Sequence, residues 1–365
     1  MESTSRLHGV RDPRSIPRRI ASMRVLVTGG TGFVGSHTVS ALCAAGHSVK
    51  LLVRDPARMA PALAPHGLEA LDFEVGDVTD AAAVERALAG CDSVVHAAAV
   101  VAMEAHRAEE VTRTNVEGVK RVLRTAHAQG LRSIVYVSSA SALFTPGTGE
   151  ICVDSPIAGG PGAYARSKAR ALEHVRELEA AGAPLRTSYP PALVGPDDPG
   201  LSGGNHTVAT FLRQSMVRTA GGFEVMDVRD LARLHATLVD PGVASGRYLV
   251  GGAMLPWDAV IALMDELTGQ RVRRVPIPAP LLRRLGGLGD FVKRLRDFEF
   301  PLTREGMEMA TQWPGVRSSP ELLSLPFRLR PARESYADTI RWLYRAGHID
   351  RRQAGPLAER DGGQA

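Results

Sequence analysis

Three side chains in the middle of the chain have the types and spacing needed for acid-base chemistry on an alcohol or a carbonyl group. Tyr164 and Lys168 are four positions apart, so on a helix both lie on one face. The pKa of a tyrosine, ordinarily about 10, falls beside an ammonium group, which suits the phenol to exchange a proton with a carbonyl oxygen. Ser139 follows an apolar run and could donate a hydrogen bond to the same oxygen. We predict Ser139, Tyr164 and Lys168 as the catalytic residues.

A tyrosine and a lysine at this spacing are common on helix surfaces, so the prediction depends on a second motif near the N-terminus. Residues 25–37 read Val-Leu-Val-Thr-Gly-Gly-Thr-Gly-Phe-Val-Gly-Ser-His, with Gly29, Gly32 and Gly35 at intervals of three. Gly29 suits a tight turn, Gly32 leaves room for a pyrophosphate, and Gly35 allows close packing of the following helix. The N–H groups at the start of that helix favour the phosphates. The motif predicts a bound dinucleotide, with an ordinary glycine-rich turn as the alternative.

The elements that must position these motifs alternate between short β-rich runs and helical patterns. Such alternation is typical of a parallel sheet covered by helices on both faces. A helix is predicted from Ser36 to Ala45, ended by Gly46. The predicted strands are Arg24–Thr28, Ser48–Val53, Asp72–Val75, Ser93–Ala97, Ser133–Ser138 and Leu185–Tyr189. The predicted fold is a doubly wound α/β (Rossmann) fold with a smaller C-terminal substrate-binding domain.

The residue after the second predicted strand bears on which nicotinamide cofactor binds. Arg54 occupies this position. A guanidinium there grips the 2′-phosphate of NADP(H) with two N–H donors, whereas a carboxylate favours the ribose hydroxyls of NAD(H). We therefore predict NADP(H) as the preferred cofactor. NAD(H) is the alternative, with Arg54 pointing into solvent and Asp55 reaching the ribose.

Small and polar residues after the third and fourth predicted strands fit the remainder of a dinucleotide. Asp77 and Val78 could meet the adenine, and residues 97–99 have small side chains where the cofactor would cross the sheet. The cofactor contacts predicted from these patterns are Gly29, Thr31, Gly32, Phe33, Val34, Gly35, Arg54, Asp77, Val78, Ala97, Ala98 and Ala99.

The positive charge of the chain is concentrated at its N-terminus. The formal net charge is +5, but residues 1–22 hold five arginines and two acidic residues, which leaves the remainder nearly neutral. We therefore predict no nucleic-acid partner. Residues 1–22 lack apolar periodicity and are predicted to be a disordered basic tail, and residues 350–365 are predicted to be a flexible tail.

The composition is that of a globular chain, with 44% apolar residues among 365. No run approaches the ~20 apolar residues needed to span a bilayer, and the N-terminus lacks the apolar segment of a secretory signal. We predict a cytoplasmic protein without an integral membrane segment. Cys43, Cys91 and Cys152 match no metal-ligand spacing and are predicted to pack as small apolar residues, so no metal site is predicted.

The glycine motif, Ser139 and the Tyr164-x-x-x-Lys168 pair together resemble the extended short-chain dehydrogenase/reductase family over residues 23–349. The resemblance implies that the tyrosine exchanges the proton, the lysine also holds the nicotinamide ribose and the serine polarises the substrate oxygen. Tyr164 and Lys168 are therefore also expected to contact the cofactor. The resemblance further implies that Asn115 supports the active-site backbone. A homodimer is compatible with the resemblance.

The segment Tyr189-Pro-Pro-Ala-Leu-Val-Gly-Pro196 corresponds to the family's Arg-Pro-x-x-x-Tyr-Gly-Pro segment. The correspondence implies that the backbone near Pro190 and Leu193 lies by the nicotinamide. The family's arginine and tyrosine are both replaced here, and these two residues are usual among nucleotide-sugar epimerases and dehydratases. The chain therefore looks less like those enzymes.

Within the family, the Val-Arg-Asp-Pro ending of the second strand and the C-terminal Phe327-Arg-Leu-Arg-Pro segment resemble the dihydroflavonol-reductase-like branch. That branch reduces ketones with NADPH. Its flavonoid-binding plant members have an asparagine five residues after the catalytic serine, where this chain has Phe144. We expect Phe144 to form an apolar wall of the substrate pocket, suited to a steroid-like or other lipophilic ketone.

The predicted function is therefore interconversion of a ketone or aldehyde and an alcohol on a lipophilic small molecule. Hydride comes from NADP(H) and the proton passes through Tyr164. One alternative is a nucleotide-sugar epimerase, which would keep its cofactor through purification. A second alternative is a non-catalytic NADP(H)-sensing regulator, although such relatives generally lack the tyrosine.

The predicted domain boundaries follow from these motifs. Residues 23–190 and about 222–250 would form the Rossmann domain, and about 191–221 and 251–349 the substrate-binding region. Residues 271–296 combine seven arginines and Lys293 with leucines and other apolar residues. We predict a helix that covers the substrate pocket and turns its charged face to solvent, with peripheral attachment to an anionic membrane as the alternative.

Overall fold

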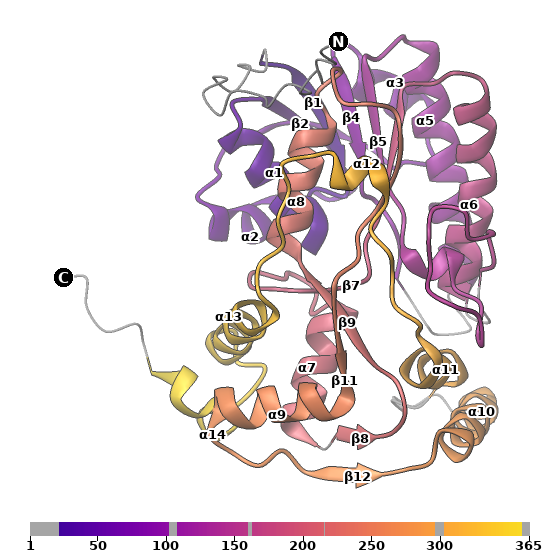
Figure 1. Cartoon of the computed structure of the whole chain (residues 1–365). Helices are drawn as coiled ribbons and strands as arrows, with labels where there is room; N and C mark the ends of the chain where they lie inside the picture. Colours follow the sequence, from indigo (N-terminus) through magenta and orange to yellow (C-terminus); the bar gives the residue numbers. More distant parts are fainter. Residues whose placement is uncertain (1–21, 102–107, 160–162, 215, 296–302, 360–365) are drawn as a thin grey trace, which may run out of the picture.

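The computed structural model describes residues 22–101, 108–159, 163–214, 216–295 and 303–359 (Figure 1). Its centre is a seven-stranded parallel sheet in the order β10-β6-β5-β4-β1-β2-β3. The strands are β1 (Arg24–Thr28), β2 (Ser48–Val53), β3 (Asp72–Val75), β4 (Ser93–His96), β5 (Ser133–Val137), β6 (Leu185–Tyr189) and β10 (Gly246–Leu249). The six strands predicted from the sequence are all present, and two of them end one residue earlier than predicted.

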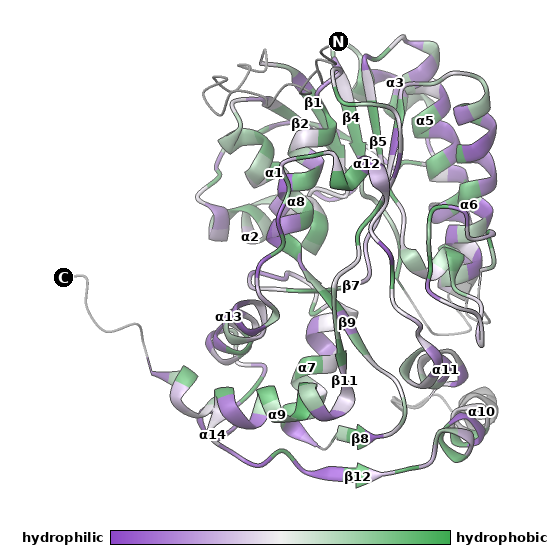
Figure 2. Cartoon of the chain, in the orientation of Figure 1, coloured by the Kyte–Doolittle hydropathy of each residue, from purple (hydrophilic) through white to green (hydrophobic). Residues whose placement is uncertain are grey.

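Helices cover both faces of this sheet, which explains why its central strands are almost entirely apolar. Val25, Leu26 and Val27 of β1 are fully buried, as expected for a parallel strand packed on both sides. One face packs against α3 (Ala81–Leu88), α5 (Gly118–Ala128) and α6 (Ala163–Ala180), the other against α1 (Phe33–Ala44) and α8 (Val228–Leu238). Figure 2 shows hydrophilic residues on the outward side of α6. The predicted doubly wound α/β fold is confirmed.

The strand order reverses between β1 and β4, and this reversal places the glycine motif. Ligands of doubly wound sheets bind outside the carboxyl ends of the strands at such a point. The backbone N–H of Ala98, just after β4, donates to Thr28 Oγ1 at the end of β1, at 3.3 Å. Helix α1 begins at Phe33, three residues earlier than predicted, because Gly32 already serves as its N-cap. The topology thus brings two distant segments to the predicted cofactor site.

A smaller lobe continues from the carboxyl ends of the strands (Figure 1). It contains a three-stranded sheet, β11-β9-β7, and the paired strands β12 and β8. Its core is formed mainly by residues of α7, α9 and α13. The elements are β7 (Ala192–Val194), α7 (Gly203–Arg213), β8 (Met216–Arg218), β9 (Gly222–Asp227), β11 (Ala253–Pro256), α9 (Trp257–Thr268), β12 (Arg274–Pro276) and α13 (Ala332–Arg345).

Two predicted boundaries differ from the structure. The second Rossmann segment was expected to begin near residue 222, but β9 pairs with β7 and β11 in the smaller sheet, so the return to the large sheet begins at α8. Residues 351–358 were expected in a flexible tail, yet they form α14 (Arg351–Ala354) and a 3-10 turn. Ala354 is fully buried, so this end packs into the smaller lobe. The predicted disorder of residues 1–21 lies outside the described residues.

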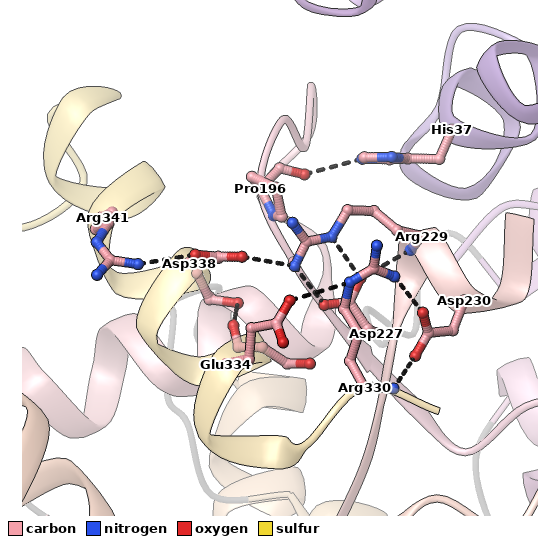
Figure 3. Close-up of polar contacts among 12 residues, drawn as sticks. His37, Pro196, Asp227, Arg229, Asp230, Arg330, Glu334, Asp338 and Arg341 are labelled. Atoms are coloured by element: carbon pink, nitrogen blue, oxygen red, sulfur yellow. Dashed lines mark hydrogen bonds and ion pairs between the residues drawn. The ribbon is translucent and has the colours of Figure 1, made fainter. Parts of the chain in front are cut away.

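Ion pairs fasten the smaller lobe to α8 (Figure 3). The Arg229 guanidinium donates to Asp227 at 2.7 and 2.9 Å and to Asp338 of α13 at 2.8 Å. On the same helix, Asp230 accepts from the backbone N–H of Arg330 at 2.6 Å and pairs with its guanidinium. The carboxylates of Asp227 and Asp230 are fully buried. Loss of one partner would leave a buried charge unpaired, which is unfavourable. The network therefore holds α13 in a defined position.

A buried histidine links three elements of the Rossmann half. His235 of α8 is fully buried, with Nδ1 3.0 Å from Thr38 Oγ1 of α1 and Nε2 3.0 Å from Ser188 Oγ of β6. Burial lowers the pKa of His235 from its ordinary 6.5 to about 3. The folded protein therefore keeps this imidazole neutral where the unfolded chain would protonate it.

We expect this difference to make the fold acid-sensitive. Between pH 6.5 and about 3 the unfolded state binds more protons, so the free energy of unfolding falls as the pH falls through this range. His235→Gln retains a donor and an acceptor but does not titrate. It should reduce the slope of the unfolding free energy against pH by the amount that corresponds to about one bound proton. Urea unfolding at a series of pH values measures this slope. Equal slopes for the wild type and the variant would contradict the assignment.

Candidate active site

One cavity of about 1070 Å³ lies outside the carboxyl ends of the strands and is lined by both lobes. All three predicted catalytic residues line it, and so do the predicted cofactor contacts, Pro190 and Leu193 included. Two other predicted site residues, Asn115 and Phe144, are not on its wall. The structure thus gathers the separate sequence motifs around a single space.

The glycine turn between β1 and α1 forms the backbone floor of this cavity. Gly29 has φ +74°, and a Cβ there would lie 2.7 Å from the Ala98 backbone. A Cβ on Gly35 would lie 1.9 Å from the Gly29 carbonyl oxygen, so the turn admits no side chain at this position. At Gly32 the nearest atom to a Cβ is the same carbonyl oxygen, at 3.4 Å, an ordinary contact. The free space at Gly32, at the N-terminus of α1, fits the phosphates of a dinucleotide.

Two arginines lie where the cavity passes the end of β2. Arg54 is exposed, and its guanidinium lies 3.8 Å from the carboxylate of Asp77. Arg58 also lines the cavity, a position that the sequence analysis missed. Its position four residues after Arg54, in a turn that follows a strand, could have indicated that Arg58 also faces the cavity. Asp55 instead accepts a hydrogen bond from the Ala57 N–H at 3.0 Å and caps the turn.

The lysine predicted to be catalytic is buried beside two tyrosine rings. Lys168 Nζ donates to the Val137 carbonyl at 2.9 Å and lies 5.3 Å from the centre of the Tyr136 ring and 5.9 Å from that of Tyr164. Burial lowers the pKa of Lys168 to about 8. Helix α6 thus carries Tyr164 and Lys168 to the end of β5, where Ser139 also lies.

Asn115 connects the chain after β4 to α6. Its side-chain amide exchanges two hydrogen bonds with the Val100 backbone, at 2.8 and 3.0 Å, and donates to Ser167 Oγ at 2.9 Å. Ser167 in turn donates to the Tyr164 carbonyl at 2.7 Å. Asn115 lies in a π-helical turn, a distortion often found at functional sites. Its contacts fit the supporting role that the resemblance implies.

The expectation that Phe144 forms the pocket wall is wrong in detail. Phe144 is only 2% exposed and packs behind Trp313, with ring centres 5.3 Å apart. Trp313, and not Phe144, lines the cavity at this position. Its indole N–H donates to Glu224 at 2.6 Å, and this buried carboxylate also accepts from the Gly252 and Val316 N–H groups. Burial raises the pKa of Glu224.

The wall contributed by the smaller lobe is largely aromatic and aliphatic. Phe223 stacks on Trp257, with ring centres 5.8 Å apart and planes 11° apart, and Phe211 meets Trp257 edge to face. Helix α10 (Ala279–Leu295) packs on α11 (Arg304–Gln312), and its Leu282 lines the cavity. Part of segment 271–296 therefore covers the pocket as predicted. No helix among the described residues has the length and apolar character to cross a membrane.

The fold and the cavity define a nicotinamide-dinucleotide-binding α/β protein. The model of the NAD dependent epimerase/dehydratase family matches residues 25–251, and the chain belongs to this family. It is an NAD(P)-dependent oxidoreductase of the extended short-chain dehydrogenase/reductase type. The resemblance to that family and to its dihydroflavonol-reductase-like branch is confirmed.

Several known proteins are similar to this chain along most of its length. "Sterol demethylase protein B" of Methylococcus capsulatus is 31% identical over 90% of this chain and 100% of the relative. A "putative dihydroflavonol 4-reductase" of Synechocystis is 26% identical over 88% and 95%, respectively. Among solved structures, vestitone reductase from alfalfa has a TM-score of 0.68 at 23% identity, covering 90% of this chain and all of that one. A UDP-glucose 4-epimerase of Bifidobacterium longum, in complex with NAD+ and UDP, has a TM-score of 0.69 at 20% identity, covering 89% and 99%.

The different surroundings of Gly32 and Gly35 generate a prediction about cofactor binding. Gly32→Ala should leave the melting temperature nearly unchanged but weaken NADPH binding about tenfold or more, because the added methyl group occupies the space for the phosphates. Gly35→Ala should lower both the melting temperature and the NADPH affinity, because the turn itself must shift. Thermal unfolding and titration of NADPH fluorescence measure the two properties. Wild-type NADPH affinity in Gly32→Ala would refute the proposed phosphate position.

Proposed function

We propose that this enzyme uses NADP(H) to interconvert a ketone or aldehyde and an alcohol on a lipophilic small molecule. The observation that carries the proposal is that Ser139, Tyr164 and Lys168 line the same cavity as the glycine turn. NADP(H), when bound, supplies or accepts the hydride. The residues of the chain must then move one proton and stabilise one developing negative charge at the substrate oxygen.

Each of the three side chains has a distinct part in this reaction. Tyr164 gives its phenolic proton to the carbonyl oxygen during reduction and takes it back during oxidation. The Lys168 ammonium, fixed on the Val137 carbonyl close to the Tyr164 ring, favours the phenolate that remains. Ser139 donates a hydrogen bond to the same substrate oxygen as its charge increases.

The surroundings of Arg54 support NADP(H) over NAD(H). Arg54 and Arg58 both line the cavity after β2 and offer guanidinium donors for a 2′-phosphate. Asp55, which would have to reach the ribose in an NAD(H) enzyme, already accepts a backbone hydrogen bond in its own turn. The ion pair of Arg54 with Asp77 is long, at 3.8 Å, and exposed, so it competes weakly with a phosphate.

The smaller lobe supports a lipophilic substrate rather than a nucleotide sugar. Among the described residues that line the cavity, the cationic side chains are Arg54, Arg58 and Lys168, and all three come from the Rossmann half. The opposite wall presents Phe211, Phe223, Trp257 and Trp313, which suits a flat apolar molecule. The similarity to the sterol demethylase protein extends over nearly the whole chain and agrees with such a substrate.

Replacing the proton donor separates an enzyme from a regulator. With a lipophilic ketone, Tyr164→Phe should lower kcat by about 10² to 10⁴ while NADPH binding changes little. Tyr344→Phe, on α13 of the smaller lobe, is the matched control and should behave as the wild type. NADPH oxidation is followed across ketones, steroids and nucleotide sugars. Tight NADPH binding by the wild type without turnover of any of them would contradict the proposed function and favour a sensor.

The cofactor preference is tested at the end of β2. Arg54→Ala should weaken NADPH binding about 10- to 100-fold through the loss of charge-assisted hydrogen bonds, and should leave NADH binding nearly unchanged. Arg86→Ala removes an exposed arginine that pairs with Glu74 outside the cavity and serves as the control. Fluorescence titration of the wild type and of Arg54→Ala with NADPH and NADH gives the four affinities to be compared. Equal losses for NADPH and NADH in Arg54→Ala would contradict recognition of the 2′-phosphate.

A further inference from the structure

Ser139 has a hydroxyl partner that the sequence analysis did not assign to the site. Ser141 Oγ lies 2.9 Å from Ser139 Oγ, and the Ser141 backbone N–H donates to Ser139 Oγ at 3.2 Å. Both side chains line the cavity, and Ser141 is 7% exposed. We propose, resting on the proposed function, that Ser141 is a positioning residue that makes Ser139 a hydrogen-bond donor toward the substrate oxygen.

The proposal follows from counting the hydrogen-bonding groups of the pair. A serine hydroxyl has one donor and two acceptor positions. When the Ser141 hydroxyl donates to Ser139 Oγ, this bond and the Ser141 N–H occupy both acceptor positions of Ser139. The proton of Ser139 then has no remaining partner within the pair and is available to the cavity. Ser139 presents a donor in this arrangement, and it offers no lone pair to a carbonyl oxygen.

The backbone around the pair is already fixed, which leaves the hydroxyl rotation as the variable. The Ala140 N–H donates to the Pro190 carbonyl at 3.0 Å, and the Ser138 N–H donates to the Ser188 carbonyl at 2.9 Å. Ser139 itself caps the 3-10 turn Ala140–Leu143. Ser141 therefore need not hold the main chain in place. Its hydroxyl decides the direction of the Ser139 proton.

A donor of fixed direction matters most when the substrate oxygen becomes negative. During reduction the carbonyl oxygen gains charge, so a preorganised donor stabilises the transition state more than the bound ketone. A freely rotating hydroxyl would have to be ordered during the reaction. Loss of Ser141 should consequently reduce kcat more than it changes KM.

Ser138 provides an internal comparison for the same substitution. Its Oγ is buried and makes no hydrogen bond to Ser139 or Ser141. Because that oxygen does not bond to the pair, its removal should not reorient the proton of Ser139. Ser138→Ala thus measures the effect of deleting a hydroxyl from this turn without touching the pair.

The experiment compares Ser141→Ala, Ser141→Thr and Ser138→Ala with a ketone that the wild type reduces. Ser141→Ala should lower kcat about three- to tenfold, the effect of one hydrogen bond. KM, NADPH affinity and melting temperature should stay near the wild-type values. Ser141→Thr retains the hydroxyl and should recover most of kcat, and Ser138→Ala should keep kcat within about twofold.

A double variant separates positioning from direct contact with the substrate. If Ser141 acts through Ser139, Ser139→Ala/Ser141→Ala has the same kcat as Ser139→Ala alone. An additional loss in the double variant would overturn the proposal and indicate direct contact between Ser141 and the substrate. Unchanged kcat in Ser141→Ala, or a fall accompanied by lower NADPH affinity and melting temperature, would also overturn it. In each of these outcomes the wild type still reduces the ketone, so the proposed function stands. If the wild type shows no turnover, both the proposed function and the role of Ser141 are contradicted.

Discussion

The close contact between the start of α1 and the turn after β1 is the constraint on which the site depends. With no Cβ at Gly35, the helix approaches the Gly29 carbonyl closely, and its N-terminus lies at the carboxyl end of the sheet. The same turn approaches the backbone after β4 at Ala98, so the two strands on either side of the order reversal meet there. Main-chain atoms therefore form the floor of the cavity. The N–H groups that this floor offers to a phosphate do not depend on the side chains of the opposite wall.

A second set of constraints comes from buried polar groups at and next to the cavity. Lys168 and Asn115 are each almost completely buried, and each uses backbone carbonyl groups as acceptors. A buried donor without a partner costs about 1–3 kcal/mol, so these bonds determine one arrangement of the surrounding segments. Through them, the end of β5 and the chain after β4 are both tied to α6. These interactions therefore position the side chains that we propose to react.

Much of the Rossmann half could be predicted because its information is local. Apolar runs of strand length and the glycine spacing define β1, α1 and their neighbours, and the positions directly after strands fall on the cavity by topology. The wall of the smaller lobe could not be predicted in this way. Trp313 faces the cavity because Phe144 supports it from behind and Glu224 holds its indole nitrogen, contacts that join distant parts of the chain. The same reason explains β9: a strand pattern predicts a strand but does not state which sheet accepts it.

The division between a local and a long-range half also explains why the fold alone does not give the substrate. A reductase and a nucleotide-sugar epimerase match this chain with nearly equal TM-scores, 0.68 and 0.69, so similarity of fold does not separate the two kinds of enzyme. Segments outside the sheet commonly determine specificity, and here the smaller lobe lines the cavity. Here it presents aromatic rings around a buried Glu224, whose carboxylate is occupied by three N–H donors. We propose that these rings favour an apolar molecule, because covering apolar surface lowers the free energy, whereas the described residues of this wall offer a diphosphate no cationic side chain. In the proposed function, specificity thus depends on packing in the smaller lobe, while the acid-base groups come from α6 and from the turn after β5.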